Sequence, residues 1–187
     1  ISAVFIISQH ISFMQVHRNT EALPSFSNAV LTIGTFDGVH TGHQQVIAQM
    51  KKEAGQISGE TVIITFDPHP RTVINAASGI RLINTIEEKE ELLSGKGIDH
   101  LVIVPFTEKF ARLTAEEYIS RFLISYFHPH TIIIGYDHHF GKGRTGNYEL
   151  LKKNAGAYHY FLKEIPAHVL DSISVISTRI KESISAG

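Results

Sequence analysis

The sequence predicts an α/β fold in which helices cover both faces of a parallel β-sheet. Short apolar runs, without strict alternation of apolar and polar residues, are separated by amphipathic stretches of helical length. This is the pattern of repeated strand–helix–strand units. The 187 residues, 43% of them hydrophobic and 19% charged, suffice for one compact domain with a real core. The same composition excludes disorder as the main state.

Five apolar runs are predicted to be strands. The first four are continuous enough to be buried on both faces, and the fifth is less apolar. They are Ala29–Gly34, Thr61–Phe66, His100–Pro105, Thr131–Gly135 and Tyr158–Leu162. In an open parallel sheet, ligands bind outside the carboxyl ends of the strands. The loops that follow the first four strands are therefore the candidate ligand loops.

Three stretches between these strands are predicted to be helices: Gly42–Ala54, Glu87–Gly95 and Ala115–Tyr126. The second follows a Thr85-x-x-Glu88 pattern and the third a Thr114-x-x-Glu117 pattern. In both patterns the threonine and the glutamate can each satisfy a free amide at the helix start, which is the capping box. The two helices are therefore expected to begin just after their threonines.

Charge and cysteine content exclude several classes of function. Lys and Arg number 17 against 18 Asp and Glu, a formal net charge of -1, so no overall field attracts nucleic acid or an anionic membrane. We expect neither as a partner. The absence of Cys excludes disulfides, thiolate zinc sites, iron–sulfur clusters and a Cys nucleophile. The 12 His residues are left as the main candidates for polar chemistry.

The first 13 residues are expected to be an upstream or non-native extension. They are apolar but include Gln9 and His10, and they fall short of the ~20 residues that a membrane-spanning helix needs. Met14 opens a segment typical of a cytoplasmic start. We therefore expect residues 14–187 to form the domain, and we expect a cytoplasmic location.

The loop after the first predicted strand contains the residues most suited to phosphate chemistry. Gly34, Gly38 and Gly42 permit tight turns and close approach to a ligand. The loop runs into a helix, and the amide groups at a helix start attract phosphate. His40 and His43 would share a face there and could offset charge on a phosphate under attack. The alternatives are two exposed loop histidines or a zinc pair, although zinc needs a third protein ligand.

Several ordered motifs resemble one family. The G-x-F-D-G-x-H-x-G-H pattern over 34–43 is followed by motifs at Thr65–Arg71, Glu87–Lys89 with Pro105–Thr107, Gly135–Gly146 and Ser177–Ile180. From about Met14 to the C-terminus, the chain resembles the flavin-adenylating domain of the bacterial bifunctional riboflavin kinase/FAD synthetases. That family lies within the nucleotidyltransferase superfamily, so the resemblance implies a Rossmann-like, doubly wound parallel sheet.

The resemblance implies transfer of AMP from ATP to FMN, which gives FAD and pyrophosphate. Mg²⁺ would accompany ATP, and no tightly bound organic cofactor would be needed. The catalytic residues would be His40 and His43. The implied ATP-binding residues are Gly34, Phe36, Asp37, His40, His43, Ser177, Thr178, Arg179 and Lys181. Ser177 and Thr178 are expected at the start of the last helix, where they could also act simply as a cap.

The resemblance also implies an FMN site. Its residues would be Phe66, Asp67, Pro68, His69, Arg71, Asp137 and Phe140. Two prolines predict an extended loop after the second strand. Arg71 either binds the FMN phosphate or only solvates this loop, and Asp137 either contacts the isoalloxazine ring or forms a turn.

The sequence departs from the family pattern in two ways. In the last motif Ile176 replaces a hydroxyl residue and Lys181 replaces an arginine, which we expect to weaken ATP binding. Full-length family members continue into a riboflavin kinase domain, and nothing here resembles its glycine-rich entrance. We therefore expect that this chain alone does not phosphorylate riboflavin and that a covalently following kinase domain is its natural partner.

Two other functions remain open. One is a related nucleotidyltransferase that acts on phosphopantetheine, nicotinate mononucleotide or glycerol phosphate. The other is a flavin- or nucleotide-binding domain without turnover. Three other enzyme types lack their motifs: Phe140 stands where a kinase P-loop needs glycine, no G-x-G-x-x-G directly follows a predicted strand, and G-x-S-x-G does not occur.

Overall fold

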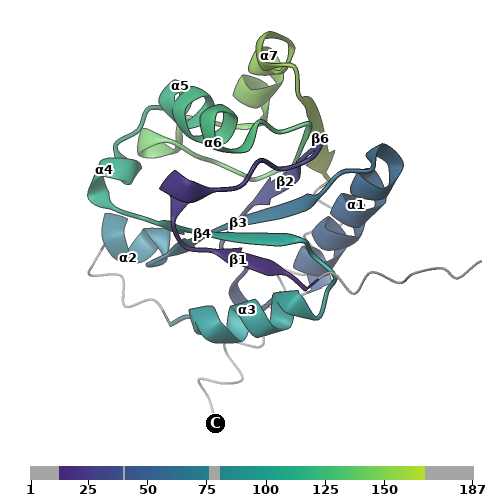
Figure 1. The fold of residues 1–187 in the computed structure, drawn as a ribbon. Coiled ribbons are helices and arrows are strands. Elements are labelled where there is room, and N and C mark those ends of the chain that lie inside the picture. Colours follow the sequence, from purple (N-terminus) through teal and green to yellow (C-terminus); the bar gives the residue numbers. More distant parts are fainter. Residues whose placement is uncertain (1–12, 40, 76–80, 167–187) are drawn as a thin grey trace, which may run out of the picture.

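The computed structural model describes residues 13–39, 41–75 and 81–166. Within these residues, six strands form one parallel sheet in the order β1-β4-β3-β2-β5-β6. The strands are β1 Gln15–His17, β2 Val30–Ile33, β3 Thr61–Asp67, β4 His100–Pro105, β5 Thr131–Gly135 and β6 Phe161–Ile165. Helices lie on both faces of the sheet (Figure 1). The predicted α/β, doubly wound fold is confirmed.

Each face of the sheet has its own core. On one face α1 (Thr41–Ile57) and α3 (Ile86–Ser94) pack against the sheet. On the other face lie α5 (Ala115–Glu117), a π-helix over Tyr118–Ile124, α6 (Ser125–Phe127) and α7 (Tyr148–Tyr158). Successive residues of the central strands alternate between the two cores, which is why those strands are apolar throughout.

The strand order reverses between β2 and β5. From β2 the chain passes through α1 to β3 and then through α3 to β4, moving in one direction along the sheet. It then crosses back over the opposite face to β5, on the other side of β2. The loops that leave β2 and β5 therefore diverge to opposite faces. A crevice opens between such loops at the carboxyl edge of the sheet.

Most predicted elements are confirmed, with shifted boundaries. The predicted bounds of β4 and β5 agree with the structure, and α1 extends the predicted Gly42–Ala54 at both ends. Both capping boxes form: Glu88 N donates to Thr85 Oγ1 at 3.2 Å and Thr85 N to Glu88 Oε2 at 2.9 Å. The predicted helix over Ala115–Tyr126 is helical throughout, but its middle is π-helical.

The predicted strand Tyr158–Leu162 begins too early. Tyr158 is the last residue of α7, and His159 ends that helix with a positive φ of 56°. The left-handed cap turns the chain, so that β6 begins only at Phe161.

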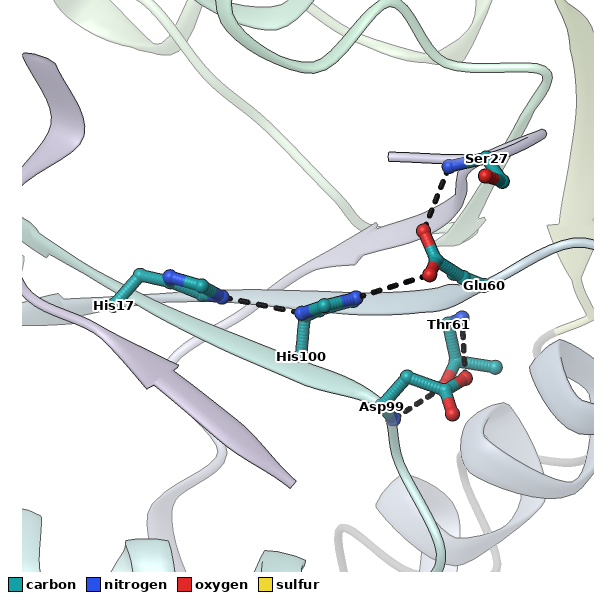
Figure 2. A network of polar contacts seen from close by, with 6 residues as sticks. All are labelled: His17, Ser27, Glu60, Thr61, Asp99 and His100. Atoms are coloured by element: carbon teal, nitrogen blue, oxygen red, sulfur yellow. Dashed lines mark hydrogen bonds and ion pairs between the residues drawn. The ribbon is translucent and has the colours of Figure 1, made fainter. Parts of the chain in front are cut away.

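Polar residues pair at the amino ends of β3 and β4 (Figure 2). Because the strands are parallel, this edge of the sheet lies opposite the carboxyl edge with the β2–β5 crevice. His17 and His100 are joined by a 3.1 Å hydrogen bond between Nε2 and Nδ1, and His100 Nε2 lies 3.7 Å from a carboxylate oxygen of Glu60. Beside them, the Asp99 carboxylate accepts from the backbone and the hydroxyl of Thr61. Burial, and to a lesser degree the charge of His100, lowers the pKa of His17.

This pairing predicts a pH-dependent stability. Because the folded protein disfavours charged His17, the unfolded state binds more protons, and stability present at neutral pH is lost as the pH falls below about 6.5. His17→Gln, whose amide can still donate to His100, should make this loss shallower. Urea unfolding at a series of pH values measures it, with His17→Gln compared against His128→Gln at an exposed histidine. An unchanged slope would contradict the assignment.

Several expectations lie outside the described residues: the extension over residues 1–12, His40, and the final motif at 176–181. Among the described residues, no helix is both long enough and apolar enough to cross a membrane.

Candidate active site

A cavity of about 910 Å³ lies at the carboxyl edge of the sheet. Its walls come from the segments that follow β2, β3, β4 and β5, together with the first turns of helices on both faces. Four loops that are far apart in the sequence meet there because all the strands are parallel. The cavity therefore lies at the edge of the sheet where the sequence predicts a ligand site.

The segment after β2 is held in a conformation that most residues avoid. Phe36, Gly38 and Val39 have φ values of 48°, 80° and 36°. A Cβ on Gly38 would lie 3.0 Å from the Ile83 side chain, so both the turn and the packing require glycine there. Asp37 ties this loop to the start of α3 because its Oδ1 accepts hydrogen bonds from the backbone of Ile83 and Asn84, at 2.8 and 3.3 Å. Such strain is maintained where the surroundings fix it, often at ligand sites.

His43 lies in the first turn of α1 and lines the cavity. Its ring stacks on Phe36, with centroids 4.6 Å apart and an interplanar angle of 29°. The first amides of an α-helix have no partner inside the helix and carry the positive end of its dipole. His43 therefore lines the cavity from the positively polarised end of α1, which suits an anionic ligand.

The segment after β3 corrects one expectation. Asp67 ends β3, and the predicted extended loop is instead the short helix α2, Pro70–Ile74. Proline is well suited to a first helical position, and His69 Nδ1 accepts a 3.2 Å hydrogen bond from Arg71 N and so caps the helix. His69 and Arg71 line the cavity, with Arg71 exposed.

An aromatic wall forms the opposite side of the cavity. Phe66 contacts Phe106 at 5.4 Å and Phe110 at 5.7 Å between ring centroids, and Tyr118 stacks on Phe140 at 4.9 Å. Edge-on and stacked rings of this kind make a large, rigid apolar surface. A flat, ring-containing ligand fits such a wall. Phe106, Phe110 and Tyr118 were not predicted as site residues, although Phe106 lies in a motif that the resemblance used.

The loop after β5 forms another part of the cavity wall. Asp137, His138 and Phe140 line the cavity, and Phe140 and Gly146 form an isolated antiparallel bridge. Burial lowers the pKa of His138 to about 4, and the charge of Asp137 opposes that shift only in part. The imidazole is therefore neutral near pH 7. Within the described chain its Nε2 is buried and has no hydrogen-bond partner.

The structure brings together most of the predicted site residues that it describes. Those that line the cavity are Gly34, Asp37, His43, Phe66, His69, Arg71, Asp137 and Phe140. Phe36, Asp67 and Pro68 do not line it: Phe36 is buried behind His43, and the other two are exposed. A direct ligand contact by these three stays a prediction. His40, Ser177, Thr178, Arg179 and Lys181 lie outside the described residues, so their predicted roles also stay predictions.

The described residues contain no cluster of three or more His, Asp or Glu side chains able to hold a metal ion. Asp37, Glu108 and Asp137 contribute single carboxylates to the cavity wall. Mg²⁺ commonly binds through one or two carboxylates, waters and the phosphates of its substrate. This donor set is compatible with a magnesium ion carried mainly by a nucleotide.

Comparison with known proteins decides the family. The FAD synthetase family model matches residues 23–179. The chain belongs to the FAD synthetase family. All four ligand loops of this FAD synthetase family member fall inside the matched range.

Relatives of this FAD synthetase family member include longer proteins. It is 35% identical to the bifunctional riboflavin kinase/FMN adenylyltransferase of Listeria monocytogenes, over 86% of this chain and 51% of that protein. The bifunctional riboflavin kinase/FMN adenylyltransferase of Escherichia coli K12 is 28% identical, over 83% of this chain and 50% of that protein. The chain thus spans about half the length of these curated relatives. A Geobacillus thermodenitrificans protein whose name gives the same two activities is 32% identical, over 93% of this chain and 92% of that protein.

A solved structure shares the fold. It is described as a macrolide-efflux protein from Streptococcus pneumoniae and matches with a TM-score of 0.68 at 24% identity, over 82% of this chain and 51% of that chain. At this identity the match concerns the fold alone.

The position of Gly141 in the cavity loop yields a stability prediction. Its φ is 72°, and a Cβ there would lie 2.7 Å from the Ala115 Cα. Gly141→Ala should therefore lower the free energy of unfolding by about 2 kcal/mol or more, from backbone strain and the clash. Gly156→Ala in α7 meets nothing within 4 Å and should raise it by about 0.5–1 kcal/mol. Urea unfolding compares the two, and equal effects would contradict this account.

Proposed function

We propose that this chain is an FMN adenylyltransferase, which transfers AMP from ATP to FMN to form FAD and pyrophosphate. One observation carries the proposal: a single cavity has the start of α1 with His43 on one side and an aromatic wall on the other. The first suits phosphates and the second suits a flavin or adenine ring. The names of the relatives support the same activity.

The reaction is a direct displacement at phosphorus. A phosphate oxygen of FMN attacks the α-phosphorus of ATP, and a new P–O bond forms while the bond to the β-phosphate oxygen breaks. Pyrophosphate leaves with the electrons of that bond. Negative charge spreads over the oxygens of the α-phosphate during the step, so donors placed around them accelerate it.

The residues divide into two groups in this proposal. His43, the amides at the start of α1 and, by the family resemblance, His40 bind and stabilise the phosphates of ATP. Phe36 keeps the His43 ring in place by stacking on it. Phe66, Phe106 and Phe140 bind the flavin ring, and Asp137 and Arg71 contact its polar groups. Ser177, Thr178, Arg179 and Lys181 would complete the ATP site.

Mg²⁺ is proposed to accompany ATP, and when bound it neutralises phosphate charge and favours departure of pyrophosphate. Asp137, whose side chain lines the cavity, is proposed to contact it or its waters. No tightly bound organic cofactor is needed, because FMN is consumed and FAD released. We place the reaction in the cytoplasm, where ATP and FMN meet, and a riboflavin kinase domain in the full-length protein would supply FMN.

The activity is tested by incubating the purified chain with ATP, Mg²⁺ and FMN and separating the products by chromatography. FAD and pyrophosphate should form in equal amounts. Riboflavin in place of FMN should give neither FMN nor FAD. If both ligands bind but no FAD forms, the chain is a binding domain; if phosphopantetheine or another phosphorylated acceptor reacts in place of FMN, the acceptor assignment is wrong.

His43→Ala should lower kcat by about 100-fold or more while leaving the fold intact, because the ring stabilises charge that develops in the reaction. Gln45→Ala, at an exposed position in the same helix, is the matched control and should keep its activity. Steady-state rates of FAD formation measure the loss of catalysis, and thermal unfolding of each variant shows whether its fold is intact. Wild-type turnover in His43→Ala would remove the histidine from the mechanism.

A further inference from the structure

A buried lysine lies behind the cavity wall and has no part in the chemistry proposed above. Lys89 of α3 is only 7% exposed. Its Nζ donates a 3.4 Å hydrogen bond to Oγ1 of Thr65, a fully buried residue of β3. Thr65 Oγ1 donates in turn to the backbone oxygen of Thr35, 3.2 Å away. Because Thr35 lines the cavity, these hydrogen bonds connect the ammonium group to the cavity wall.

The same lysine lies within the field of two carboxylates. Burial lowers the pKa of Lys89, while the negative charges of Asp37 and Asp67 act in the opposite direction and favour the protonated form. Asp37 lines the cavity on the loop after β2, and Asp67 ends β3. A buried cation is costly unless opposite charge compensates for it. The three side chains are thus best understood as one compensated group.

The position of this group is fixed by the fold. Asp37 accepts hydrogen bonds from Ile83 and Asn84, which directly precede the capping residue of α3. Lys89 follows one turn into that helix, so the loop that carries Asp37 and the helix that carries Lys89 are fastened together. The ammonium group therefore cannot leave the neighbourhood of the loop without disturbing both.

We propose that Lys89 is a positioning residue that offsets the carboxylates of Asp37 and Asp67 and so keeps the phosphate side of the cavity receptive to anionic ligands. This inference rests on the proposed function, because it takes the phosphates of ATP and FMN as those anions. Without the lysine, the charges of Asp37 and Asp67 would be uncompensated and would repel the phosphates. Lys89 acts on the ligands through its field and through Thr65 and Thr35, without touching them.

The test compares ligands that differ in charge but not in ring. Calorimetric titration measures the affinities of wild type and Lys89→Met for FMN against riboflavin and for ATP against adenosine. Lys89→Met should weaken FMN and ATP binding about tenfold, the effect of a unit charge at roughly 10 Å with an effective dielectric of about 20. Riboflavin and adenosine should bind as before. In the FAD assay, KM for ATP should rise more than kcat falls.

Two variants serve as controls. Lys89→Arg keeps the charge and should restore the preference for FMN over riboflavin. Lys51→Met removes an exposed lysine that donates to the backbone oxygen of Lys96 at 3.0 Å, away from the cavity, and should leave all four affinities unchanged. If Lys89→Met weakens charged and neutral ligands alike, the lysine is structural and the inference is wrong.

If Lys89→Met does not fold, as judged by thermal unfolding, Asp67→Asn carries the test. Removing that charge should raise the preference for FMN over riboflavin, and a fall or no change overturns the inference. A wild type that shows the charge-dependent binding but makes no FAD overturns the proposed function and leaves the role of Lys89 standing. A wild type that binds none of the four ligands overturns both.

Discussion

The reversal of strand order beside β2 is the constraint on which the rest of the site depends. All six described strands are parallel, so every strand delivers its following segment to the same edge of the sheet. Because the chain leaves β2 for one face and enters and leaves β5 from the other, the two loops separate and leave a crevice. The glycine-rich loop before α1 and the loop over 136–146 are far apart in the sequence, yet this topology alone makes them neighbours.

Burial of the central strands explains which parts of the fold the sequence predicts. The runs over β2 to β5 are apolar on both faces, so these continuous apolar segments predict buried strands even though apolar and polar residues do not alternate. The capping boxes predict where two of the helices begin. The edge strands carry no such signal. β1 has only three residues, none of them buried, and β6 has only one buried residue, so the sequence pattern missed the first strand and misplaced the second.

The candidate site divides in the same way. Its phosphate side follows from local pattern, because glycines, histidines and a helix start are contiguous between Gly34 and His43. The aromatic wall does not, because Phe110 and Tyr118 lie on different short helices and only tertiary packing turns them toward Phe66 and Phe140. The burial that lowers the pKa of His138 is equally invisible in the sequence, where the residue is one of two adjacent histidines.

The two sides of the cavity rely on different physical devices, and this difference bears on selectivity. The aromatic wall gains its energy from contact area, which it offers to any flat ring of suitable size. The phosphate side gains its energy from charge, and there Asp37 would work against the ligand if nothing balanced it. A fold that needs the Asp37 carboxylate to tie down a strained loop must therefore supply a cation nearby. Lys89, buried where the same loop meets α3, meets that need without occupying space in the cavity.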